Sequence, residues 1–275
     1  MRAERRATRI GRVMRTGTRL AALAGLLASA APSFGGRKRG AGRHLQRLCR
    51  RLLAVFEIRV HLLGAVPTDG LIVCNHLGYL DILVLGAAIP AVFVAKREVA
   101  SWPVFGWFAR KSGTIFVRRE RRADSGQAAS AICAALRTGV PVVLFPEGTS
   151  SGGEGVLPFK SSLLAPPGGV RVVAAALAYA LEPGDGDPAE EISYWKGMRL
   201  LPHLLGVLAK RRIRAVLVLD PPREPRTGRK ELAVSLRGRV QQLHALARAQ
   251  AGRGLGEERA GPVLAGEAMA VLAPS

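Results

Sequence analysis

Short apolar runs alternate with helical stretches between residues 70 and 220, and this rhythm constrains the fold more than any other feature of the chain. The 275 residues are 48% hydrophobic, which is enough to bury a sizeable core. Because strands separated by helices form parallel sheets, we predict an α/β fold with a largely parallel central sheet flanked by helices. The expected strands lie at 71–74, 91–95, 114–117, 141–145, 170–177 and 213–219, and the expected helices at about 80–88, 125–138 and 231–249.

The first fifth of the chain is strongly basic. Residues 1–50 contain 13 Lys or Arg and one acidic residue, so they hold +12 of the formal net charge of +21. A surface this basic predicts an anionic partner, either a membrane or a nucleic acid. The longest apolar run, Leu20–Ala31, would rise only about 18 Å as a helix, against a hydrocarbon core of roughly 30 Å. It is too short to cross a bilayer by itself.

Two interpretations of this basic arm stay open. The charged start, the apolar run and Ala28-Ser29-Ala30 are typical of a cleaved signal peptide. Alternatively, the arm is a membrane-binding segment that lies in the headgroup layer, followed by a basic amphipathic helix from Arg43. The apolar stripe of that helix either joins the anchor or packs on the core, and it consists of Leu45, Leu48, Leu52, Val55 and Phe56. We expect a basic N-terminal arm at 1–43, a main domain at 44–250 and a loosely ordered tail at 251–275.

A histidine and an aspartate, His76 and Asp81, lie where a predicted strand ends and a helix begins. Ligands bind at this edge of an open α/β sheet. On one continuous helix the two side chains would point about 140° apart, so we expect His76 on the turn and Asp81 in the first helical turn. The carboxylate then orients the imidazole, which acts as general base toward a substrate hydroxyl. A histidine with this spacing is more often structural when nothing else accompanies it.

Two further blocks follow apolar strands. The first reads Gly-Thr-Ile-Phe-Val-Arg-Arg from Gly113, and its arginines suit bidentate binding of phosphate, although a solvated basic loop explains most such pairs. The second reads Phe-Pro-Glu-Gly-Thr from Phe145, with Pro-Phe-Lys at 158–160, and it combines a carboxylate, a flexible backbone and a hydroxyl. Each block by itself is a weak signal.

The three blocks together are specific. In their order and spacing, Asn-His-x4-Asp, Gly-x-Ile-Phe-Val-x-Arg and Phe-Pro-Glu-Gly-Thr, the chain resembles the glycerolipid acyltransferase family over roughly residues 70–180. The resemblance implies that a fatty acyl group moves from acyl-CoA or acyl carrier protein to the free hydroxyl of a lysolipid, without a cofactor. It implies that His76 is the general base and that Asp81 orients it. It also implies substrate-binding roles for Lys96, Gly113, Phe116, Arg119, Glu147, Gly148 and Thr149.

Three positions depart from the family pattern. Members that act on lysophosphatidic acid commonly have Arg directly after Glu-Gly-Thr, where this chain has Ser150, and a Pro often found in the later strand block is replaced in the Val172–Ala175 stretch. The family often has Ser at the position of Gly78, which is a small residue either way. Losing a cation near the acceptor site weakens the case for a phosphate monoester. The family default, 1-acyl-glycerol-3-phosphate giving phosphatidic acid, is the expected acceptor, and a lyso-ornithine lipid or another lysophospholipid is the alternative.

The expected location is the cytoplasmic face of a membrane, with peripheral or monotopic attachment to an anionic surface, or outside the cytoplasm if the arm is a signal peptide. Three separated cysteines allow no disulfide framework, and the five histidines have no metal-ligand spacing. A nucleic-acid partner is not expected, because the chain lacks zinc-finger, RNP and basic-zipper motifs. A serine hydrolase would need Gly-x-Ser-x-Gly, whereas residues 148–152 read Gly-Thr-Ser-Ser-Gly. A non-catalytic membrane adaptor is the remaining alternative.

Overall fold

The computed structural model describes residues 2–34, 41–102, 104–117, 122–164, 166, 168–225, 227–253 and 269–272. Its helices are α1 (Arg2–Ala30), α2 (Ala41–Val55), α3 (Leu80–Ala88), α4 (Phe105–Lys111), α5 (Arg122–Arg137), α6 (Pro188–Glu191), α7 (Leu200–Leu208) and α8 (Arg229–Gly252). Its strands are β1 (Ile58–Leu63), β2 (Leu71–Cys74), β3 (Val92–Lys96), β4 (Ile115–Val117), β5 (Val142–Leu144), β6 (Val172–Leu181), β7 (Ile213–Leu219) and β8 (Met269–Leu272).

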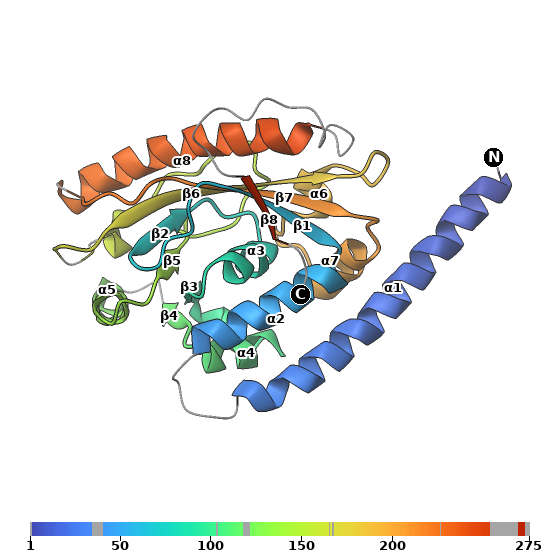
Figure 1. Cartoon of the computed structure of the whole chain (residues 1–275), viewed down its shortest axis with the longest axis horizontal. Helices are drawn as coiled ribbons and strands as arrows, with labels where there is room; N and C mark the ends of the chain where they lie inside the picture. The colour runs from blue at the N-terminus through green and yellow to red at the C-terminus, as the bar shows by residue number, and fades with distance from the viewer. Residues whose placement is uncertain are drawn as a thin grey trace.

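The strands of the described residues form one mixed sheet in the order β4-β3-β5-β2-β6-β7-β1-β8. The five strands from β4 to β6 are mutually parallel, and β7 is parallel to β1. Strand β7 pairs antiparallel with β6, and β8 pairs antiparallel with β1. Helix α8 covers one face of this sheet, and α2 and α3 lie on the other (Figure 1). The predicted α/β fold with a mostly parallel sheet flanked by helices is therefore confirmed.

The elements agree with the sequence pattern best where a strand is buried on both faces. All four residues of β2 are buried, and β2 and β7 have the predicted bounds. Burial on both faces makes such strands continuous apolar runs, which are easy to recognise. Strand β1 was not predicted because Arg59 and His61 interrupt its apolar residues. Part of the expected loose tail, Met269–Leu272, is paired in the sheet as β8.

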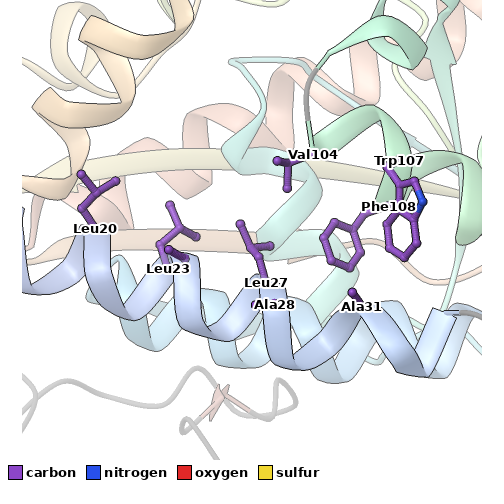
Figure 2. Close-up of a pocket in the computed structure, with 9 residues that line it drawn as sticks. Leu20, Leu23, Leu27, Ala28, Ala31, Val104, Trp107 and Phe108 are labelled. Atoms are coloured by element: carbon purple, nitrogen blue, oxygen red, sulfur yellow. The ribbon is translucent and has the colours of Figure 1, made fainter.

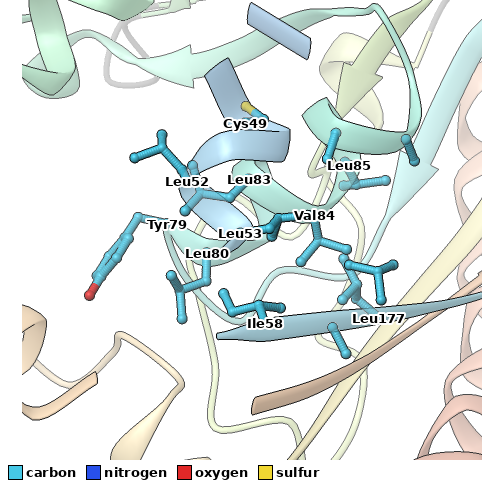
Figure 3. Packing of buried hydrophobic residues seen from close by; sticks show 14 of the residues in the cluster. Cys49, Leu52, Leu53, Ile58, Tyr79, Leu80, Leu83, Val84, Leu85 and Leu177 are labelled. Carbon is cyan, nitrogen blue, oxygen red and sulfur yellow. The ribbon is translucent and has the colours of Figure 1, made fainter. Parts of the chain in front are cut away.

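The apolar stripe of α2 packs into the core. Leu48 and Leu52 are buried, and Figure 3 shows Leu52 and Leu53 beside Leu83 of α3, above Ile58 of β1. Close packing at this contact also explains Gly86, where a Cβ atom would lie 2.8 Å from the Cys49 sulfur. The stripe therefore stabilises the fold, and it is not free to face a headgroup layer.

Helix α1 is a single helix of 29 residues that lies outermost, beside α2 and α7 (Figure 1). Its inner face buries Leu23 and Leu26. The Arg19 guanidinium donates to the Leu208 carbonyl at 3.0 Å and also to the Lys210 carbonyl. A cation at these carbonyls is favourable because the C-terminal end of a helix carries partial negative charge. Among the described residues, every helix is too short or too polar to traverse a bilayer.

Candidate active site

The turn between β2 and α3 brings His76 and Asp81 together as the sequence predicts. Asp81 is fully buried, and its Oδ2 accepts from His76 Nδ1 at 2.8 Å. The same oxygen accepts from the backbone N–H groups of Leu77 at 2.6 Å and Gly78 at 2.9 Å. These donors fix the carboxylate, and the carboxylate in turn fixes the plane of the imidazole. The His76 side chain is 23% exposed, so its other nitrogen, Nε2, is left to exchange a proton with a substrate.

Neighbouring strands hold the histidine in place. The Asn75 side chain, buried at the end of β2, donates to the Leu177 carbonyl at 3.0 Å and accepts from the Leu177 N–H at 2.8 Å. The His76 ring stacks on Phe145, which follows β5, with ring centroids 4.2 Å apart. Because β2 and β5 are parallel neighbours, their carboxyl ends bring these two rings to the same edge of the sheet. The backbone around His76 is thus fixed on both sides.

Glu147 joins the two motif loops. It is 3% exposed, and its Oε1 and Oε2 accept from the N–H groups of His76 at 2.9 Å and Leu157 at 3.1 Å. Burial raises the pKa of Glu147 to about 7, against the opposing effect of these two hydrogen bonds. Both carboxylate oxygens are engaged by the backbone, so this geometry suits a positioning role at the turn that carries His76 better than direct contact with substrate.

Tyr179 is a site residue that the sequence reasoning missed. Its hydroxyl, on β6, donates to Asp81 Oδ1 at 2.9 Å, so both oxygens of the aspartate are engaged. Burial, together with the nearby Asp81 carboxylate, raises the pKa of Tyr179, which keeps the phenol protonated as a donor. The residue lies 98 positions after Asp81, in an otherwise apolar strand. A lone tyrosine hydroxyl in a buried strand is the available signal, because it needs a partner there.

Replacing Tyr179 with phenylalanine is expected to lower kcat about tenfold with little change in the acceptor KM. The carboxylate without this donor is a stronger acceptor and holds the imidazolium more tightly. The acid limb of kcat/KM against pH should therefore move to higher pH. Tyr194→Phe is the control, because it removes a hydroxyl that is hydrogen-bonded to the Met198 carbonyl and not to Asp81. In this variant the acid limb of kcat/KM should stay at the same pH as in the wild type. An unmoved acid limb in Tyr179→Phe would show that the hydroxyl only stabilises the fold.

The other predicted site residues do not all lie at the same edge of the sheet as His76. Lys96, the exposed last residue of β3, lies on the same carboxyl edge of the sheet as His76, with β5 between the two strands. Gly113, with φ 83°, precedes β4 and therefore lies at the amino end of that strand, away from the carboxyl edge of the sheet. Phe116 is half-buried within β4. Arg119 lies outside the described residues. In the loop after β5, Gly148 is buried with φ 81° and Thr149 is exposed.

Apolar space lies next to the turn that carries His76 and Asp81. A cavity of about 90 Å³ is lined by Tyr79 of that turn together with side chains of α2, α3 and α4. A larger apolar groove of about 620 Å³ separates α1 from α4 (Figure 2). Figure 2 shows Leu20, Leu23 and Leu27 of α1 facing Val104, Trp107 and Phe108. Leu27 and Phe108 line both spaces, so the groove and the cavity are neighbours.

The titratable side chains near the turn do not form a metal site. Within the part of the chain that the structure describes, no group of three or more His, Cys, Asp or Glu residues is placed to hold a metal ion. The arrangement is that of an acid–base pair beside apolar space.

The fold resembles that of a solved lipid enzyme. The crystal structure of the 1-acyl-sn-glycerophosphate acyltransferase from Thermotoga maritima superposes with a TM-score of 0.64. The match covers 88% of this chain and 98% of that one, at 20% sequence identity. At that identity, the likeness establishes a shared α/β architecture.

Sequence comparisons define the family. A family model described as Acyltransferase matches residues 57–166. The lyso-ornithine lipid O-acyltransferase of Brucella abortus is 36% identical over 223 residues, which cover 75% of this chain and 84% of that protein. The lyso-ornithine lipid O-acyltransferase of Rhizobium meliloti is 39% identical, and the 1-acyl-sn-glycerol-3-phosphate acyltransferase of Neisseria meningitidis is 37% identical. These two matches cover 60% and 54% of this chain, and each spans 61% of the relative's length. The chain belongs to the acyltransferase family of lipid biosynthesis, as its three motif blocks predicted.

Proposed function

We propose that this protein transfers a fatty acyl group from acyl-CoA or acyl carrier protein to the free hydroxyl of a lysolipid. The observation that carries the proposal is the His76–Asp81 pair, in which a buried carboxylate held by backbone donors orients a partly exposed imidazole. Acyl transfer to an alcohol needs a base beside the hydroxyl and apolar space for the chains. The turn supplies the first and the neighbouring cavity and groove supply the second.

This geometry supports the following reaction. The His76 Nε2 takes the proton of the acceptor hydroxyl as its oxygen attacks the thioester carbonyl. The Asp81 carboxylate stabilises the imidazolium that forms. When the carbon–sulfur bond breaks, the imidazolium returns its proton to the leaving thiolate, so the products are an ester and a free thiol. Glu147 and Tyr179 act through His76 and Asp81 as positioning residues.

A lyso-ornithine lipid is the acceptor that we favour, ahead of the expected 1-acyl-glycerol-3-phosphate. The Ser150 hydroxyl donates to the Tyr194 carbonyl, so the residue after Glu-Gly-Thr binds backbone and offers no cation to a phosphate. The longer matches, over 223 and 203 residues, are with proteins named lyso-ornithine lipid O-acyltransferases. Lysophosphatidic acid, which is 1-acyl-glycerol-3-phosphate, is the second candidate. It is supported by two relatives named 1-acyl-sn-glycerol-3-phosphate acyltransferase, at 37% and 41% identity.

A panel of acceptors tests the proposal. The purified full chain is given a labelled acyl donor with lyso-ornithine lipid, lysophosphatidic acid or lysophosphatidylethanolamine, and the lipid products are resolved. We expect a labelled product with the added acyl chain, formed fastest from the lyso-ornithine lipid. A faster reaction with lysophosphatidic acid would assign the second acceptor. No acylated lipid from any acceptor, with either acyl-CoA or acyl carrier protein as donor, would contradict the function.

We further propose that α1 attaches the protein peripherally to the cytoplasmic face of an anionic membrane. Large apolar side chains of α1 remain exposed beside its arginines, namely Ile10, Val13, Met14 and Leu20. Its other face is bound to the domain through Arg19 and the buried leucines, contacts more typical of a retained helix than of a cleaved signal peptide. A helix with apolar and basic side chains exposed together suits an interface with anionic lipid.

Introducing glutamate at Val13 and Met14 together is expected to weaken binding to anionic vesicles about tenfold. The change removes apolar contacts with the lipid and adds two negative charges, which the anionic headgroups repel. Vesicle sedimentation measures the partition coefficient, and thermal unfolding checks that the fold is kept. Val234→Glu is the matched control, because Val234 is 75% exposed on α8, over the other face of the sheet (Figure 1). Equal partitioning of the double variant and the control would assign α1 another role.

A further inference from the structure

The segment Tyr194–Lys196, which we call the strap, joins α6 to α7 and lies against both motif loops. The Tyr194 N–H donates to the Leu77 carbonyl of the catalytic turn at 2.8 Å. The Tyr194 carbonyl accepts from the Ser150 hydroxyl in the loop after β5. Since Ser151 N–H also donates to the His76 carbonyl at 3.0 Å, the strap, the turn and this loop form one hydrogen-bonded unit.

Two glycines allow the strap to approach this closely. A Cβ atom at Gly78 would lie 2.9 Å from the Tyr194 nitrogen, and one at Gly152 would lie 2.6 Å from the Trp195 ring. Real Cβ atoms do not approach so closely, so any larger residue would push the strap outward. Gly78 and Ser150 therefore both contact the strap.

The strap carries an exposed cation, Lys196. Lys196 has φ 51°, a left-handed conformation that is uncommon for a residue with a side chain. Its ammonium lies 3.7 Å from the centre of the Trp195 ring, and the residue is exposed. Trp195 is fixed in turn, because its indole N–H donates to the Ala189 carbonyl at 2.9 Å. Strained residues persist where the surrounding contacts determine them, and they cluster at ligand sites. A lysine held on a fixed indole loses little freedom when it binds an anion.

We propose that the strap forms the head-group wall of the acceptor site and that Lys196 binds the anionic group of the acceptor. This inference rests on the proposed lysolipid acyltransferase function. The Ser150 hydroxyl is hydrogen-bonded to the strap and carries no charge, and Lys196 supplies a positive charge from the strap. The group bound is a carboxylate if the acceptor is a lyso-ornithine lipid, and a phosphate if it is lysophosphatidic acid.

The kinetic constants of Lys196→Met test this role. With the acceptor that the wild type uses, we expect the acceptor KM to rise about tenfold, because a charge-assisted contact is lost. The donor KM and kcat should stay unchanged, and Lys196→Arg should restore most of the acceptor affinity. Lys230→Met, an exposed lysine of α8, is the matched control. Running both acceptors separates a carboxylate contact from a phosphate contact.

The failures of the two proposals can be told apart. If the wild type acylates none of the lysolipids of the panel with either donor, the proposed function is wrong and the inference falls with it. If the wild type is active and Lys196→Met keeps its acceptor KM, the function stands and the role of Lys196 is wrong. A fall in kcat together with a rise in both KM values would show that the lysine only shapes the site, which also overturns the proposal.

Discussion

Replacing His76 with alanine is expected to lower kcat by at least about 10³-fold, because the variant lacks the base that takes the proton of the acceptor hydroxyl. The ring is 23% exposed and stacks on Phe145, so its loss should leave the fold intact. The measurement is formation of acylated lipid over time at saturating donor and acceptor. Glutamine at the same position should be equally inactive, because an amide keeps much of the volume but cannot accept the proton.

Retained binding distinguishes lost chemistry from lost structure in this variant. Partitioning to anionic vesicles and the thermal unfolding midpoint should match the wild type. An active His76→Ala protein would contradict the mechanism outright. An inactive protein that also unfolds cooperatively at a much lower temperature would leave chemistry and fold confounded, and His76→Gln is included to resolve that case.

Asparagine in place of Asp81 is expected to lower kcat about 10³-fold, which is comparable to the loss of His76 itself. Asp81 Oδ2 accepts three hydrogen bonds, from His76 Nδ1 and from the N–H groups of Leu77 and Gly78, and a neutral amide oxygen is a weaker acceptor for them. The neutral side chain also cannot stabilise the imidazolium. Steady-state kinetics should show the loss in kcat with a small change in either KM, because the interaction is made with the base and not with the substrates.

Asp69→Asn is the matched control for this variant. Asp69 is a carboxylate that pairs with Arg171 at 2.6 Å in the turn before β2, so it lies at the opposite end of that strand from His76. Its variant should keep wild-type kcat. The double variant His76→Ala, Asp81→Asn should be about as inactive as either single variant, because the two residues work as one unit. If the loss of kcat in the double variant equalled the product of the two single losses, the two residues would act independently, which would contradict a shared role.

The fold was predictable from the sequence where local pattern and burial agree. Strands β2 and β7 are buried on both faces, and their apolar runs end where the strands end. The pairing of His76 with Asp81 was predictable for a similar reason: a five-residue spacing across a strand-to-helix turn brings the two side chains to one place. Their catalytic roles remain predictions until the variants are measured.

Other contacts depend on residues far apart in the chain, which a local pattern cannot pair. Tyr179 of β6 contacts Asp81 of α3, and the Tyr194 backbone contacts Leu77 and Ser150 from a loop without regular structure. The apolar stripe of α2 could suit either a membrane or a core, and only its packing on α3 decides between them. Helix α4 was not predicted because its seven residues are too few to show a helical period.

The most direct test of the central claim compares thiol release with ester formation in the same reaction. The acyl thioester is mixed with the full chain, with and without lyso-ornithine lipid or lysophosphatidic acid, and the free thiol and the acylated lipid are both quantified. If His76 activates the acceptor hydroxyl for direct attack, thiol and ester should appear in equal amounts, only when an acceptor is present, and neither should form with His76→Ala. Thiol release with free fatty acid in the absence of acceptor, or ester formation that does not need His76, would contradict the account.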